Sequence, residues 1–248
     1  MGHGHATICT LSGLNTSSCQ TSGIGQNVYS IAISSDKTVA YLADGYGFID
    51  TCIISGYSLT NCTQHSSASG EMLYINGSTL YTQAGYGSAL SICSVNGTNV
   101  TSCSTNNIGL NPLTGIDTLG DAIFMVDNNN SPNNNVTGCL ISGNVTSSCA
   151  STQLLDNYPF GIAIYNSTAF ITSTQNSKVT SCTISGQSLT NCAHTISAVK
   201  GYGIHVHDSI AYIATGSSIY GCPIAGSNFT SCSQVLTGLT SAYDFAIA

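Results

Sequence analysis

The chain has 248 residues, of which 42% are hydrophobic and only 5% are charged, and its formal net charge is −7 at pH 7. It has no arginine and only three lysines, so it lacks the positive surface that binding to nucleic acid or to anionic lipid requires. Its apolar content suffices for a packed core, and no apolar run approaches the roughly 18 residues that cross a bilayer as a helix.

Cysteine pairs are the first regular feature along the chain. Each pair encloses nine residues and contains a turn dipeptide that ends in glycine, for example Ser12-Gly13 or Asn96-Gly97. The six pairs are Cys9 and Cys19, Cys52 and Cys62, Cys93 and Cys103, Cys139 and Cys149, Cys182 and Cys192, and Cys222 and Cys232. Such a spacing suits a tight β-hairpin, in which opposite residues lie about 4.5–5.5 Å apart at Cα, within reach of a disulfide.

The pattern therefore predicts six disulfides, each local to one hairpin. Closing a loop of this length stabilises the fold by about 2.8 kcal/mol through chain entropy. Zinc sites use cysteines only two to four residues apart, and the chain has no such spacing between successive cysteines. Persistent disulfides are typical of oxidising compartments, so we expect the protein to be secreted or exposed at a cell surface.

Two short strand-like runs follow each of the first five cysteine pairs. The first runs are 30–33, 72–75, 115–118, 161–164 and 203–206, with a sixth at 244–247; the second runs are 39–42, 80–82, 122–125, 169–172 and 210–213. The first cysteine of each pair recurs after 43, 41, 46, 43 and 40 residues, so each unit carries four strands. This period predicts an all-β fold, a six-bladed β-propeller that forms a single domain over residues 1–248.

The last blade is predicted to be closed by both chain ends and to be one strand short. Its innermost strand would come from residues 243–248 and its two outer strands from residues 5–20, with no run left for the second strand. Three explanations stay open: an incomplete chain, a rearranged N-terminal segment that fills the slot, or a strand donated by another chain.

Two segments resemble a known repeat family. The run 159–164 (PFGIAI), followed by 168–172 (TAFIT), looks like the NHL and YVTN-type propeller repeat, as does 40–44 (AYLAD). The resemblance extends over all six units and implies the propeller fold. Propellers of this kind include binding modules, extracellular scaffolds and metal-dependent lactonases, so the resemblance implies no single activity.

Candidate ligand-face residues precede or occupy the innermost strands. They are Tyr29, Tyr158, Tyr202, Tyr243, Asp117 and His205. Exposed tyrosines near Asn and Ser suit sugar binding, and the alternative is ordinary packing between blades. Acidic residues near the channel (Glu71, Asp117 and Asp244) with His205 and His207 would suit a metal-dependent hydrolase, but solvated single polar groups explain them better, and we assign no metal, cofactor or catalytic residue.

Nine Asn-x-Ser/Thr sequons are candidate glycosylation sites. They are Asn15, Asn61, Asn76, Asn96, Asn99, Asn135, Asn144, Asn166 and Asn228. The sequence as a whole indicates a non-catalytic extracellular protein with a structural or adhesive role. It would act through protein contacts, including self-assembly by strand complementation of the incomplete blade. The alternatives are a lectin that binds glycans and a lactonase-like hydrolase.

Overall fold

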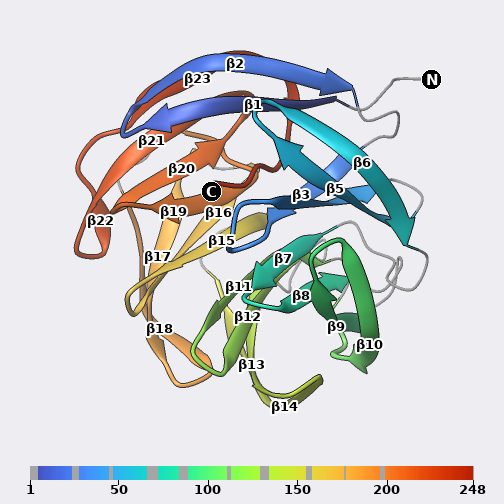
Figure 1. Cartoon of the computed structure of the whole chain (residues 1–248). Helices are drawn as coiled ribbons and strands as arrows, with labels where there is room; N and C mark the ends of the chain where they lie inside the picture. The colour runs from blue at the N-terminus through green and yellow to red at the C-terminus, as the bar shows by residue number, and fades with distance from the viewer. Residues whose placement is uncertain are drawn as a thin grey trace. The chain divides into compact units, whose positions relative to one another are not determined.

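The computed structural model describes residues 5–23, 28–44, 47–65, 72–83, 89–110, 113–128, 134–154, 158–175, 177–195 and 199–247. All regular elements in these ranges are β-strands (Figure 1). Within them no helix is long and apolar enough to span a membrane. The chain divides into two compact units, Met1–Gly109 with Ala246–Ala248, and Leu110–Phe245.

The first unit contains ten strands in three antiparallel sheets. The strands are β1 (His5–Ser12) and β2 (Asn15–Gly23); β3 (Val28–Ile33), β4 (Val39–Asp44), β5 (Ile49–Ser55) and β6 (Ser58–His65); and β7 (Leu73–Asn76), β8 (Thr79–Gln83), β9 (Ala89–Asn96) and β10 (Asn99–Asn107). In both four-stranded sheets each strand pairs with its neighbour in sequence, so each sheet is a simple meander.

The second unit contains two sheets with the same meander and a third sheet of five strands, in which both of the last two strands pair with the third. Its strands are β11 (Leu113–Leu119), β12 (Ala122–Asn128), β13 (Asn134–Ser142) and β14 (Val145–Gln153); β15 (Pro159–Tyr165), β16 (Thr168–Ser173), β17 (Val179–Ser185) and β18 (Ser188–His194); and β19 (Ile204–His207), β20 (Ile210–Ala214), β21 (Gly216–Ala225), β22 (Asn228–Phe229) and β23 (Ser233–Ala242). In Figure 1 the strands β15 to β18, yellow to orange, form one such sheet.

The core lies between neighbouring sheets. In the second unit, Phe124 and Val126 of β12 pack in one apolar cluster with Ile162 of β15 and Ile171 of β16. The second strand of each meander is the most deeply covered, and all six residues of β4 are buried. Such strands, covered on both faces, consist of the short β-branched, aromatic and small-residue runs noted above.

Each of the six cysteine pairs forms a disulfide within one hairpin, with its residues ten apart in sequence. The turn between the cysteines places glycine first, as in Gly97-Thr98, where Gly97 has a φ of +56°. A positive φ at the first central residue only is typical of a type II′ hairpin turn. The turn glycines therefore meet a backbone requirement, as the sequence predicts.

A bulge lies beside five of the disulfides. The residue before the second cysteine is left-handed, with φ between 47° and 50°, at Ser18, Asn61, Ser102, Ser148 and Asn191. The register shifts at the same place, so that two residues of the last strand face one cysteine. Threonine one residue earlier donates its hydroxyl back across the hairpin in several units, as Thr60 does to the Ile53 carbonyl at 3.4 Å.

The first and last parts of the chain differ from the sequence prediction. The two-stranded sheet β1–β2 has no third strand among the described residues, so a sixth four-stranded blade is not seen. Residues 244–247, predicted as an innermost strand, are not assigned to a strand. Without a neighbouring second strand to form a ladder, this segment attaches instead through single contacts, such as Gly203 N–H to the Tyr243 carbonyl at 2.8 Å.

Candidate ligand-binding surfaces

Glycines at the start of three segments allow unusually close backbone contacts in the second unit. A β-carbon at Gly115 would lie 2.7 Å from the Phe160 carbonyl oxygen, and one at Gly161 would lie 2.6 Å from that of Tyr202. At Gly203 the corresponding distance to the Tyr243 oxygen is 2.9 Å. Real β-carbons do not approach an oxygen so closely, so only glycine lets each of these segments contact the facing carbonyl.

These contacts bring three aromatic rings into a row, which we call the aromatic ladder: Phe160, Tyr202 and Tyr243. The Phe160 and Tyr202 ring centroids are 5.4 Å apart, and those of Tyr202 and Tyr243 are 4.9 Å apart, both with edge-to-face geometry. Phe160 and Tyr202 are half-buried, whereas Tyr243 is 44% exposed. The ladder thus presents one accessible end.

One candidate from the sequence, Tyr158, is not part of the ladder. The ladder residue in this sheet is Phe160, two residues later. Tyr158 has a left-handed φ of 56° and donates its backbone N–H to the Asn134 side chain at 3.3 Å. The signal that could have identified Phe160 is its place directly before the glycine, as in Tyr202-Gly203.

His205 lies close to the open end of the ladder. Its ring contacts Phe245 edge-on with centroids 5.0 Å apart, and its Nε2 is 3.7 Å from an Asp244 carboxylate oxygen. The side chain of His205 is 34% exposed and that of Asp244 is 11% exposed. The segment 243–245 therefore places one phenol, one carboxylate and one aromatic ring along the first residues of β19.

Asp117, by contrast, has a structural role. One carboxylate oxygen accepts the N–H of Thr118 at 2.7 Å, and the other accepts the N–H of Ile164 in the neighbouring sheet at 2.6 Å. These bonds link β11 to β15 and use both oxygens. In the first unit the Ser30 hydroxyl oxygen plays a similar part, since it accepts the Leu73 N–H at 3.0 Å.

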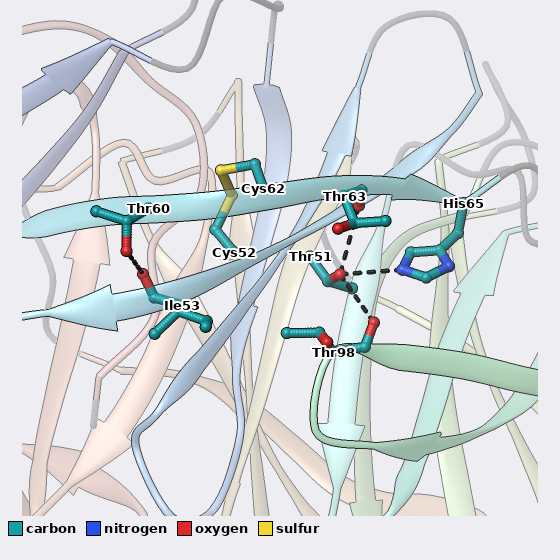
Figure 2. Close-up of a disulfide and its surroundings, with 8 residues drawn as sticks. All are labelled: Thr51, Cys52, Ile53, Thr60, Cys62, Thr63, His65 and Thr98. Carbon is teal, nitrogen blue, oxygen red and sulfur yellow. Dashed lines mark hydrogen bonds between the residues drawn. A yellow bond between two sulfur atoms is a disulfide. The ribbon is translucent and has the colours of Figure 1, made fainter.

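A polar cluster surrounds one disulfide hairpin of the first unit (Figure 2). Thr51 Oγ1 lies 2.9 Å from the Thr98 carbonyl and 3.0 Å from His65 Nε2. A hydroxyl has a single hydrogen, and we assign it to the carbonyl, so that His65 donates from Nε2. Thr98 belongs to the hairpin turn of the next sheet, so this contact ties two sheets together.

Two carboxylates lie near this cluster. Asp44 is fully buried and accepts the Phe48 N–H at 2.8 Å and the Gln64 amide at 3.3 Å. Burial raises the pKa of the Asp50 carboxyl, the charge of Asp44 raises it further, and His65 acts in the opposite direction. The cluster is organised by contacts within the unit, and we assign no ligand to it.

The remaining candidates are spread over the surface. Tyr29, the first-unit residue at the position equivalent to Tyr202, is 47% exposed. Seven sequon asparagines are exposed and two, Asn135 and Asn144, are half-buried. No group of three His, Cys, Asp or Glu among the described residues could hold a metal ion. Glu71 lies outside the described residues.

Comparison with known proteins places the chain by fold only. No protein-family model and no curated protein matches it. Among solved structures, that of a nidogen/laminin complex matches with a TM-score of 0.72 and 14% identity, covering 92% of this chain and 88% of that one. A putative 6-phosphogluconolactonase from Bacteroides fragilis matches with a TM-score of 0.64 and 13% identity, covering 93% and 77%. The chain is therefore an all-β propeller with a disulfide in each cysteine hairpin, and the NHL and YVTN assignment is not confirmed.

Proposed function

We propose that this protein is secreted or displayed at a cell surface and acts without catalysis, by binding other proteins. Its twelve cysteines are all paired, which is typical of proteins that work in oxidising surroundings. A similar fold occurs in the nidogen/laminin complex, an assembly of proteins. The lactonase alternative has support from the fold alone.

One observation carries the proposal: among the residues that the structure describes, one edge of β1 pairs with no other strand. In the four-stranded meanders, the strand that carries the first cysteine of a disulfide lies between two others, as β17 lies between β16 and β18. Within the described residues β1 pairs only with β2. Its second edge offers a row of backbone N–H and C=O groups that a strand from a partner protein can pair with.

The last strands of the four-stranded sheets are less suited to such pairing. Asn61 of β6 and Ser148 of β14 are left-handed beside a disulfide and interrupt the regular spacing of these strands. In the β1–β2 hairpin the same irregularity is at Ser18 of β2, so β1 keeps an extended edge. We infer that β1 takes up a partner strand, and that a second copy of this chain could supply it, which would produce self-assembly.

Hydrogen exchange tests this proposal directly. We expect alternate amides of β1 to exchange quickly in the monomer, because only those that face β2 are bonded. A synthetic peptide that copies β16 (TAFITS, flanked by lysines) should slow the remaining β1 amides, since β16 occupies the equivalent place beside β17. The matched control is the same peptide with proline in place of Phe170, which removes a backbone donor.

Sedimentation velocity on the oxidised protein gives the second measurement. Concentration-dependent association that the β16 peptide reverses would support self-assembly through β1. The proposal fails if a bound partner slows hydrogen exchange in other strands but leaves the exchange rates of the β1 amides unchanged. Association that persists in the presence of saturating peptide would place the contact elsewhere.

A further inference from the structure

We propose that the open end of the aromatic ladder, Tyr243, together with His205 near the next two residues of the chain, Asp244 and Phe245, is a binding site for a neutral sugar ring. This inference is independent of the strand-pairing proposal, because it concerns side chains of the second unit and none of β1.

The Tyr243 ring is fixed without being covered. Tyr202 contacts it edge-to-face at 4.9 Å, and Tyr202 is itself wedged between Phe160 and Gly216, whose β-carbon position is 3.7 Å from the Tyr202 ring. The backbone of Tyr243 is held by the N–H of Gly203 at 2.8 Å. A ring held in this way and still 44% exposed is preorganised to stack against a ligand at little entropic cost.

Polar groups are contributed by the residues that follow Tyr243 and by the histidine that contacts them. His205 is about one-third exposed and is oriented by Asp244 at 3.7 Å and by the Phe245 ring. An imidazole can both donate and accept hydrogen bonds, and so can the Tyr243 phenol. A pyranose presents an apolar face of C–H groups together with hydroxyls at its edge, and this combination of ring and polar groups matches both.

The charge in this region disfavours the other small ligand classes. Asp244 is acidic, and the chain has no arginine and only three lysines, so phosphate and other anions would lack paired cations. A purely apolar ligand would leave the His205 and tyrosine groups without partners. The remaining competitor is a proline-rich peptide, which also stacks on tyrosine, and the experiment separates the two.

Binding can be measured with the protein's own tyrosine fluorescence, because the chain has no tryptophan. The oxidised protein is first screened on an array of neutral and N-acetylated oligosaccharides, alongside an array of proline-rich peptides. The best oligosaccharide is then titrated against Tyr243→Ala, Tyr243→Phe and His205→Gln. The matched control is Tyr29→Ala, which removes an equally exposed tyrosine from the first unit.

We expect Tyr243→Ala to weaken sugar binding at least tenfold, His205→Gln to weaken it severalfold, and Tyr243→Phe to retain most of it. Tyr29→Ala should bind as the wild type does. Melting curves of every variant show whether each is folded, and His205→Gln, which should still weaken binding severalfold, keeps the test valid if the alanine variant is not. Absence of any oligosaccharide hit, equal losses for Tyr29→Ala and Tyr243→Ala, or selective binding of proline-rich peptides would overturn the proposal.

Discussion

The sheet β11–β14 and the hairpin β1–β2 contain the same clasp with different support. Cys139 of β13 is fully buried, and β13 lies between β12 and β14. Cys9 of β1 is only half-buried, Cys19 is exposed, and the strands form a sheet of two. An isolated hairpin is marginally stable at best in water. The disulfide joins residues with the same Cα separation, 4.1 Å, in both places, so we expect burial between strands to determine how much each hairpin contributes to global stability.

The largest expected effect comes from a contact that exists only where sheets are complete. A β-carbon at Gly138 would clash with the Gln187 carbonyl oxygen in the next hairpin turn. We expect Gly138→Ala to lower the free energy of unfolding by about 3 kcal/mol, because backbone on both sides must move. Chemical denaturation of the oxidised protein measures this.

Gly143→Ala is the matched control in the same sheet. Gly143 has a φ of +58°, and nothing lies within 4 Å of its β-carbon position, so only backbone strain of about 1 kcal/mol is expected. If the two variants lost equal stability, the close contact between neighbouring sheets would not be the source of the effect.

The next largest effect should come from removing a disulfide, and it should differ between the sheet β11–β14 and the hairpin β1–β2. The double variant Cys139→Ala with Cys149→Ala should lose about 2.8 kcal/mol of global stability, from the entropy of an eleven-residue loop. The corresponding change at Cys9 and Cys19 should increase hydrogen exchange in β1 and β2 and leave the melting of the remaining sheets unchanged. A global loss of the same size at both sites would contradict the comparison.

The smallest expected effect comes from the burial of a carboxyl group, that of Asp50, in a four-stranded sheet. Burial raises the pKa of Asp50 in β5, so the folded state holds its proton at a pH where the unfolded state has released it. Stability from this group therefore falls as the pH rises from the unfolded pKa through the higher folded pKa. Asp50→Asn should be slightly more stable than the wild type at neutral pH, and its stability should change less between pH 4 and pH 7. Thermal melts over this range test the sign.

Features that depend on residues near in sequence were predictable. The ten-residue cysteine spacing and the glycine in each interval determine hairpins and turns, because both ends of the constraint lie in one hairpin. Contacts between sheets were not predictable in the same way. The aromatic ladder depends on which residue precedes each glycine, so the sequence prediction includes Tyr202 and Tyr243 but not Phe160. The left-handed residues before the second cysteine, such as Asn61, carry no signal stronger than a preference of asparagine for that conformation.

The short loops that the disulfides close also affect the order in which the bridges can form during synthesis. Each bridge joins residues ten positions apart, so both partners emerge from a ribosome or translocon within moments of each other. Oxidation can then proceed vectorially, one hairpin at a time, before any later sheet has been synthesised. We expect this order of synthesis to disfavour bridges between distant units.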